Sequence, residues 1–285
     1  MENHSSKDVD ILREWLSKQP HLPKKIDDIL LRRFLSAAEN SIERAKYLID
    51  LFFTIRSQSP EIFSDRDPNQ AGIRAIFQII DYLMLPKRVR NNNVFLYRIT
   101  SSNVDDYDFA NAVKAFFIVA DARMIEEENI PDGEIPMFDM KNFSARHLTR
   151  IVFPILRKYM MYTQEAHPVR LKEIHLLNVP SFLDRVMALI RPFLKAEVAK
   201  MLHFHLPNSA TLFEFIPKEV LPEEYGGTAG NCKDIKKHWM DVVTKRREYL
   251  LDESRWAVDE NKRPDNNKSK ELFSVQGSFK SLCID

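Results

Sequence analysis

Apolar residues follow two different patterns along the chain, and the pattern changes near residue 90. Up to that point, apolar positions recur at helical spacing over residues 8–19, 27–56 and 73–83. The middle stretch is interrupted at Asn40, and Ser41 can cap a new helix there. These residues predict an all-helical N-terminal region.

Beyond residue 90, short apolar runs alternate with longer helical stretches. Strands are predicted over residues 94–99, 135–140, 171–179 and 202–206. Helices are predicted over residues 108–128, 144–164, 180–198 and 234–251. Within the second of these helices, Pro154 predicts a kink. Alternation of strands and helices is typical of βαβ units with a mainly parallel sheet.

Residues that interrupt helices and strands divide the sequence into three parts. Pro86 and the three asparagines that follow it end the helical pattern. We therefore expect a helical domain over residues 1–86 and an α/β domain over residues 87–250. The polar residues 251–285 predict a flexible tail.

The helix predicted at residues 180–198 has an unusually wide apolar face. At ~100° per residue, its apolar side chains cover an arc of roughly 160°. A surface helix that packs on one core needs little more than ~100°. Near the end of this helix, Pro192 removes a backbone hydrogen bond and provides a flexing point.

Charge and composition give few hints of a partner. The 42 basic residues nearly cancel the 41 acidic ones, so a net charge of +1 predicts no general attraction to nucleic acid. The cysteines, Cys232 and Cys283, form no disulfide framework, which favours a reducing compartment. The first ten residues lack the apolar core of a signal peptide, and the apolar run at residues 115–120 is too short to span a bilayer. We expect a soluble cytoplasmic monomer.

The residue patterns of common catalytic sites are missing. None of the six glycines lies directly after the strand predicted at residues 94–99, where a phosphate-binding loop would need them. There is no Walker A sequence, nucleophile elbow or HExxH. His203 and His205 lie on one side of a strand, but no third metal ligand is evident. The sequence therefore predicts no cofactor, no metal and no enzymatic reaction.

Several helices predicted to lie half exposed at the surface carry more large apolar side chains than one buried face needs. These side chains cluster at residues 116–118 and again at residues 151–161. Two interpretations stay open from the residues alone, a tight core on both sides of a sheet or the wall of an apolar cavity.

Several segments together resemble the CRAL-TRIO family. Residues 27–63 resemble its N-terminal helical part, and "VFLYRI", "MFDMKNFSARHLTRI", "HPVRLKEIHLLNVPSFLDRVMALIRPFL" and "IPKEVLPEEYGG" resemble its lipid-binding domain in order and spacing. The resemblance spans about residues 10–250. It implies a mixed sheet that forms the floor of a deep apolar pocket, under a helix that opens at membranes. Residues 180–198 would be that gate.

The resemblance also implies the site residues. The floor, the walls and the inner face of the gate would bind ligand through Phe95, Tyr97, Phe116, Phe138, Met140, Ile151, Ile155, Tyr162, Ile174, Leu176, Asn178, Phe182, Val186, Leu189 and Phe193. Among these, Tyr97, Asn178 and Tyr162 are the polar groups that could orient a ligand oxygen. The outer face of the gate, which would enter lipid, comprises Leu183, Met187, Ile190 and Leu194.

The match departs from the members of the family that sense phosphoinositides. Ser36, Ala38, Ala199 and Met201 stand where basic residues are usual in those members. Arg33 and Lys200 remain as a possible anion site. Weak, salt-sensitive binding to phosphoinositide headgroups is therefore expected.

The sequence as a whole predicts a carrier for one small lipophilic molecule, such as a retinoid, carotenoid, tocopherol or other isoprenoid. It would touch membranes transiently. Two alternatives stay open, a phospholipid or phosphoinositide exchange protein that regulates lipid signalling and an interaction domain that transports nothing.

Overall fold

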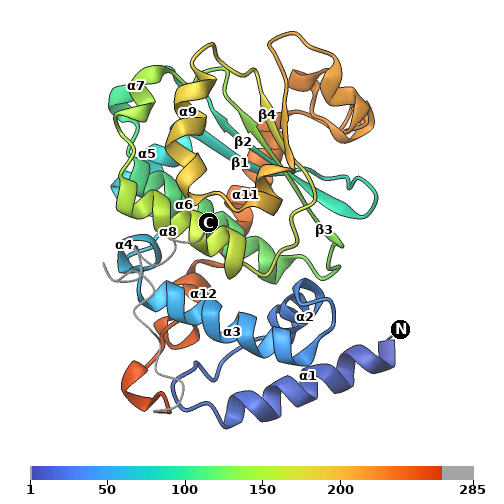
Figure 1. The fold of residues 1–285 in the computed structure, drawn as a ribbon, viewed down its shortest axis with the longest axis vertical. Helices are drawn as coiled ribbons and strands as arrows, with labels where there is room; N and C mark the ends of the chain where they lie inside the picture. The colour runs from blue at the N-terminus through green and yellow to red at the C-terminus, as the bar shows by residue number, and fades with distance from the viewer. Residues whose placement is uncertain (1, 265–285) are drawn as a thin grey trace, which may run out of the picture.

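The computed structural model describes residues 2–264, with side chains from residue 6 onward. The N-terminal helices form a layer below the rest of the molecule (Figure 1). The Ser41 hydroxyl accepts a hydrogen bond from the backbone N–H of Arg44, so a helix begins where the sequence predicted its cap. The layer consists of α1 (Glu2–Ser17), α2 (Asp28–Ala37), α3 (Ile42–Ser57) and α4 (Pro60–Phe63).

The second part of the chain is built on a sheet of five strands in the order β1-β2-β3-β4-β5. β1 runs antiparallel to β2, and all other neighbours are parallel. The prediction of N-terminal helices followed by a mixed, mainly parallel sheet is therefore confirmed. The strands are β1 (Ile80–Met84), β2 (Asn92–Ile99), β3 (Gly133–Asp139), β4 (Ile174–Leu177) and β5 (Leu202–Phe204).

The first strand corrects the sequence prediction. Residues 73–83 were predicted to be one helix, but helix α5 (Ala71–Ile79) ends at Ile79 and the chain continues as β1. All five residues of β1 are buried, and Tyr82 and Leu83 pair with residues of β2. Burial in the sheet thus outweighs the local helical pattern. β1 also belongs to the sheet although it precedes the domain boundary expected after residue 86.

The helix predicted over residues 144–164 is also interrupted. α7 (Ala145–Leu148) ends early, and α8 (Phe153–Glu165) begins again after a short extended segment. Pro154 lies in the first turn of α8, where its missing N–H costs no helical hydrogen bond. It therefore starts a helix instead of kinking one.

Helix α6 (Phe109–Glu126) lies between the N-terminal layer and the sheet. Phe117 packs in the core of the N-terminal helices, whereas Ile118 packs in the core of the sheet. A helix that is buried on two sides needs apolar side chains on both of those sides. The apolar run at residues 116–118 is explained in this way as core.

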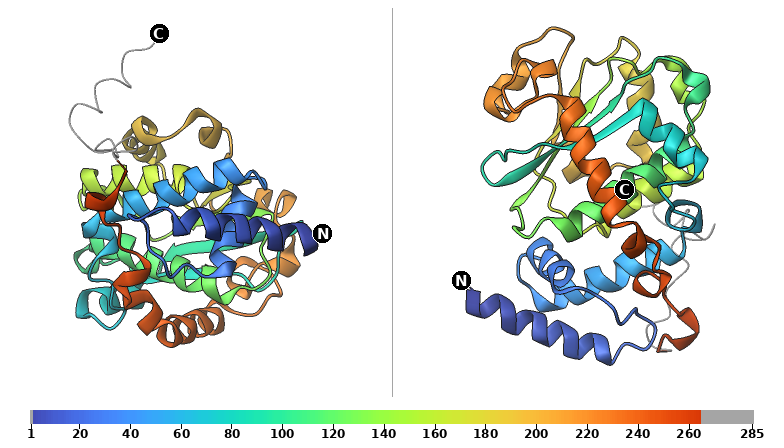
Figure 2. Two further views of the ribbon diagram at one scale, coloured as in Figure 1. Left: turned by 90° about the horizontal axis from the view of Figure 1, so that it is seen from below. Right: turned by 180° about the vertical axis from the view of Figure 1, so that it is seen from behind.

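The remaining helices cover the two faces of the sheet. α9 (Leu183–Ile190) lies over one face, and α11 (Cys232–Lys245) crosses the opposite face (Figures 1 and 2). No helix within residues 2–264 is long and apolar enough to cross a membrane. Shorter turns occur at Val104–Asp106 (η1), Arg191–Phe193 (η2), Ala196–Ala199 (α10), Thr211–Glu214 (η3), Lys218–Val220 (η4), Glu223–Tyr225 (η5), Glu253–Arg255 (η6) and Glu260–Lys262 (η7).

The end of the described chain folds back onto the N-terminal layer. After α12 (Arg247–Leu251), the ring of Trp256 lies 4.4 Å from the Arg56 guanidinium. Arg263 is buried and donates hydrogen bonds to Asp50 at 2.8 Å and Thr54 at 2.7 Å. Residues 252–264 are therefore packed, which differs from the flexible tail expected there. The rest of that predicted tail, residues 265–285, lies outside the described residues.

Candidate functional site

A row of large side chains crosses one face of the sheet. Tyr82 pairs with Tyr97, Tyr97 with Phe138, Phe138 with Leu176, and Leu176 with Phe204. Directly paired residues point to the same face, so these side chains form one continuous surface. We call it the floor row. The sequence anticipated its middle three members, because alternate residues of a strand share a face.

The central strand shows that this face is not fully covered. Ile135 and Met137 of β3 point to the opposite face and are 0% exposed. Pro136 and Phe138, on the face of the floor row, are only half-buried. A strand in the middle of a sheet is normally buried on both faces when helices cover both. The half-burial of Phe138 therefore indicates space above the floor row.

The residues that surround this space form a small apolar cluster of their own, separate from the two larger cores. Its buried members come from the sheet, its loops and the segment around α9, and they are Met140, Ile174, Leu176, Val179, Val186 and Val198. Phe138 and Phe182 pack against it. We call it the floor cluster. It brings together predicted floor residues with the predicted inner face of the gate.

The predicted gate is not one continuous helix. α9 ends at Ile190, Pro192 lies in the tight turn η2, and Leu194 has an extended backbone before α10. Val186 is the buried residue of α9, whereas Met187 and Ile190 are half-buried. The break falls where the sequence placed a flexing point.

The two predicted faces of the gate are not cleanly separated. Leu183 and Leu194, assigned to the outer face, pack against the floor cluster. Leu189 and Phe193, assigned to the inner face, are half-buried. The turn at η2 changes the direction of the chain, so a single helical wheel does not describe residues beyond Ile190.

The end of the gate contacts α8 through a few polar groups, chiefly the side chain of Gln164. The Gln164 amide donates to the carbonyl of Phe193 at 2.9 Å and accepts from the N–H of Lys195 at 2.9 Å. The ammonium of Lys195 also lies 3.5 Å from the Glu165 carboxylate. These contacts hold η2 against α8 with only a few polar groups.

The predicted wall residues lie in different places. Phe116 stands between cores, with its ring 5.5 Å from Phe95 and 5.6 Å from Tyr159. Ile155 is part of the core of the N-terminal layer, and Ile151 is half-buried just before α8. Ile155 is thus separated from the floor cluster, because that side of α8 faces α3.

Of the predicted polar groups, Tyr162 lies deepest in the protein. It is 0% exposed, and its hydroxyl accepts a hydrogen bond from Arg56 at 2.9 Å. The amide of Asn178 donates to Asp139 at 2.8 Å, and its positive φ of 50° is one that asparagine tolerates. Both side chains therefore have partners within the protein.

Tyr97 lies beside the floor cluster, with its ring 5.8 Å from that of Phe138. Its hydroxyl interacts with that of Tyr107. Burial raises the pKa of both phenols, that of Tyr107 to about 12, so both remain protonated. They form a polar end to an otherwise apolar space.

His147 extends this polar end and was missed by sequence reasoning. Its ring stacks on Phe143 at 5.1 Å and meets Tyr107 edge-on at 5.2 Å. Its Nδ1 accepts from the N–H of Ser144 at 3.0 Å, so the proton of the neutral ring is on Nε2. Burial lowers the pKa of His147, which favours that neutral form. Within residues 2–264, this buried Nε2 has no hydrogen-bond partner.

The possible anion site is divided in the structure. Arg33 is 2% exposed and donates to the Met124 carbonyl at 2.8 Å and to Glu127 at 3.1 Å. Its guanidinium thus fastens α2 to α6. Lys200 is exposed near the start of β5. The Arg33 guanidinium therefore has partners within the protein. The sequence could not show this, because those partners are distant along the chain.

His175 is the third histidine that sequence reasoning did not connect to His203 and His205. The ring of His175 stacks on those of His203 at 5.0 Å and His205 at 5.2 Å. Stacked rings do not converge on one point, and Nδ1 of His175 is 2.9 Å from Nε2 of His205. Among the described residues, no group of histidine, cysteine or acidic side chains is arranged to hold a metal ion.

Comparisons with known proteins agree with this architecture. Residues 88–227 match the CRAL/TRIO domain, and residues 1–73 match the Pinta-like UBA domain. The chain is 28% identical to alpha-tocopherol transfer protein-like of Mus musculus, over 87% of this chain and 71% of that protein. It spans 66% of the Homo sapiens form.

A second relative and a solved structure extend the comparison. The chain is 25% identical to clavesin-2 of Rattus norvegicus, over 93% of this chain and 80% of that protein. The crystal structure of Sfh5 has a similar fold, with a TM-score of 0.53 and 14% identity over 87% of this chain and 98% of that one.

Proposed function

Because the chain belongs to the CRAL-TRIO family, we propose that it binds one small lipophilic ligand between the sheet and α9 and transfers it between membranes. The observation that carries the proposal is the half-buried Phe138 on the central strand, opposite fully buried neighbours on the other face. Relatives named for tocopherol transfer support the same class of ligand. No bond of the ligand is made or broken.

The polar end narrows the class of ligand. His147 offers an N–H donor that has no partner among residues 2–264, beside the protonated Tyr107. A buried donor without a partner destabilises the protein, and a hydrogen bond to a ligand oxygen would remove that cost. The preferred ligand therefore has an apolar body and one oxygen that accepts a hydrogen bond, as retinoids, tocopherols and oxygenated isoprenoids do. The apolar wall discriminates by shape, with each methylene worth ~1–3 kcal/mol.

The gate would act through the segment from α9 to α10. The polar contacts of Gln164 hold it closed over the floor cluster, and η2 lets it bend. Its half-buried apolar residues, Met187 and Ile190, would enter the lipid interface on opening. The protein would then need membranes only transiently.

Native mass spectrometry of the protein from its own tissue tests this function. We expect one bound molecule of a single-chain or ring-and-tail lipophile, which a fluorescent retinoid or tocopherol analogue displaces. A two-chain phospholipid would favour a lipid-exchange protein, and a well-packed protein that retains and binds no lipophile would favour an interaction domain.

A further inference from the structure

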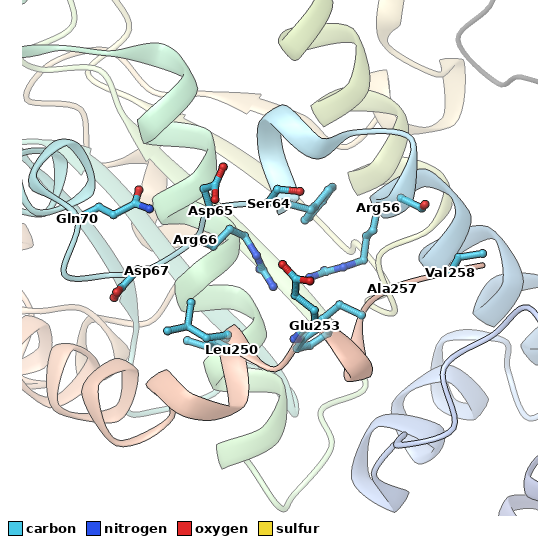
Figure 3. A pocket seen from close by; sticks show the side chains of 14 residues that line it. Arg56, Ser64, Asp65, Arg66, Asp67, Gln70, Leu250, Glu253, Ala257 and Val258 are labelled. Carbon is cyan, nitrogen blue, oxygen red and sulfur yellow. The ribbon is translucent and has the colours of Figure 1, made fainter. Parts of the chain in front are cut away.

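A second hollow lies far from the floor cluster, between the N-terminal layer and the end of the described chain. It has a volume of about 400 Å³ and is lined by the ends of α3 and α4, the loop after α4 and residues 250–258 (Figure 3). Arg56, Arg66, Phe63 and Trp256 form much of its wall. No residue of the floor row or of α9 contributes to it.

Two arginines lie at the base of this hollow and share one carboxylate. The side chains of Arg56 and Arg66 are 1% and 2% exposed, and that of Asp121 is 0% exposed. Arg56 binds both oxygens of Asp121, at 3.1 and 2.7 Å, and Arg66 binds one of them. The pair formed by Arg56 and Asp121 is therefore complete without Arg66.

The buried group carries one more positive than negative charge. Tyr162 and His167 lie beside it, but burial raises the pKa of Tyr162 and lowers the pKa of His167 to about 3. Both are uncharged near neutral pH, so two guanidinium groups face one carboxylate. A buried charge without a counter-charge is costly, and an anion would relieve that cost.

Hydrogen-bond donors are also left over. A guanidinium has five N–H groups, and Arg66 uses one of its nitrogens on Asp121. Within residues 2–264, the buried Nε of Arg56 has no partner. The rings of Phe63 and Trp256 lie 4.3 and 4.4 Å from the Arg56 guanidinium and cover its faces. The edges of the guanidinium groups remain for acceptors, an arrangement that suits planar or tetrahedral oxyanions.

The acidic residues around the hollow do not satisfy these donors. Asp67 is held by Arg247 at 2.8 Å, which together with the backbone N–H of Asn69 lowers its pKa to about 2. Asp65 lines the hollow but is exposed. The Glu253 carboxylate points toward the two guanidinium groups in Figure 3, yet it forms no ion pair with either. Glu253 is thus placed to compete weakly with an incoming anion.

We propose that this hollow is a binding site for a small oxyanion, a phosphate or carboxylate group, held by the free edges of Arg66 and Arg56. The anion could be free in solution or part of a lipid headgroup, since the donor geometry is the same for both. This site is separate from the lipophile site and does not depend on the function proposed above.

The test uses the full chain and inorganic phosphate, at constant ionic strength maintained with chloride. Isothermal titration should give saturable binding that Arg66→Met abolishes. Glu253→Gln should tighten binding roughly fivefold, because it removes a like charge from the mouth of the site. Arg44→Gln, an exposed arginine of the same layer, is the matched control and should leave binding unchanged.

A thermal melt separates binding from folding. Because Asp121 keeps Arg56, the Arg66→Met protein should melt no lower than wild type in chloride, and it should lose the stabilisation by phosphate. If Arg66→Met does not fold, Glu253→Gln alone decides. Phosphate binding that neither variant alters, or that Arg44→Gln alters equally, would overturn the proposal.

A second arm identifies the source of the anion. Vesicles of phosphatidylcholine, with and without a phosphoinositide, are sedimented with each protein. Binding that needs the phosphoinositide and Arg66, without binding of inorganic phosphate, assigns the site to a lipid headgroup. Binding of inorganic phosphate alone assigns it to a free anion. Binding of neither refutes the site.

Discussion

Ile174 and Ile135 can distinguish a residue that lines a cavity from one that lies in a filled core. Ile174 lies in β4 and packs in the floor cluster with Val186 of α9. Ile135, in β3, points into the filled core on the opposite face and is 0% exposed. The two isoleucines are chemically identical, so they form a matched pair.

We therefore expect Ile174→Trp to abolish binding of a fluorescent lipophile with only a small change in melting temperature, because open space absorbs added volume. Ile135→Trp should instead lower stability by ~1–3 kcal/mol or more, since a packed core cannot absorb it. Ligand titration and thermal melts of both variants check this. A large loss of stability in Ile174→Trp without a binding defect would show that Ile174 is core.

His147 provides a prediction about ligand polarity. In His147→Asn, the amide oxygen can still accept from the N–H of Ser144, but the Nε2 donor is lost. We expect affinity for an oxygen-bearing lipophile such as retinal to fall roughly 5–10-fold, the value of about one hydrogen bond. Affinity for a polyene hydrocarbon of the same length should not change. Equal losses for the two ligands would mean that His147 only supports the fold.

At the scale of elements, the closed gate depends on the contact between α8 and η2. Gln164 makes two hydrogen bonds to the backbone at Phe193 and Lys195. The neighbouring Thr163 bonds only within α8, to the carbonyls of Tyr159 and Met160. Gln164 thus links two elements, whereas the hydrogen bonds of Thr163 stay within one helix.

We expect Gln164→Leu to speed transfer of a fluorescent lipophile to vesicles several-fold, because the closed segment loses ~1–3 kcal/mol of polar contact. Thr163→Val, the matched control, should leave the rate unchanged. Stopped-flow transfer rates, with a thermal melt beside them, measure the effect. A folded Gln164→Leu protein with the wild-type rate would show that the contact does not limit opening.

At the scale of the whole molecule, buried histidines make stability depend on pH. Burial lowers the pKa of His167 to about 3 and, with help from neighbouring histidines, that of His175 to about 4. In the unfolded chain both take up protons below about pH 6.5. Their contribution to stability is therefore complete above pH 6.5 and falls as the pH drops toward 4.

We expect the free energy of unfolding to be roughly 4 kcal/mol lower at pH 5 than at pH 7.5, from about 1.4 kcal/mol per pH unit for each histidine. Urea unfolding at the two pH values measures it, and His167→Phe should remove about half of the difference. Equal stability at both pH values would contradict the lowered pKa values.

The sequence by itself determined the order of helices and strands beyond residue 90 and the middle of the floor row. Tyr97, Phe138 and Leu176 were found because side chains alternate along a strand, which depends only on neighbours in the chain. Pro192 likewise marked the break in the gate, because proline in the interior of a helix removes a backbone hydrogen bond.

Only the tertiary structure decided the rest. β1 became a strand because β2 lies beside it, against its local helical pattern. Arg56 meets Asp121 although they are 65 residues apart, and His147 of α7 meets Tyr107, which precedes α6. Such contacts depend on how distant elements pack. Local periodicity does not contain that information, so Arg56, Asp121 and His147 could be assigned to the proposed sites only in the folded molecule.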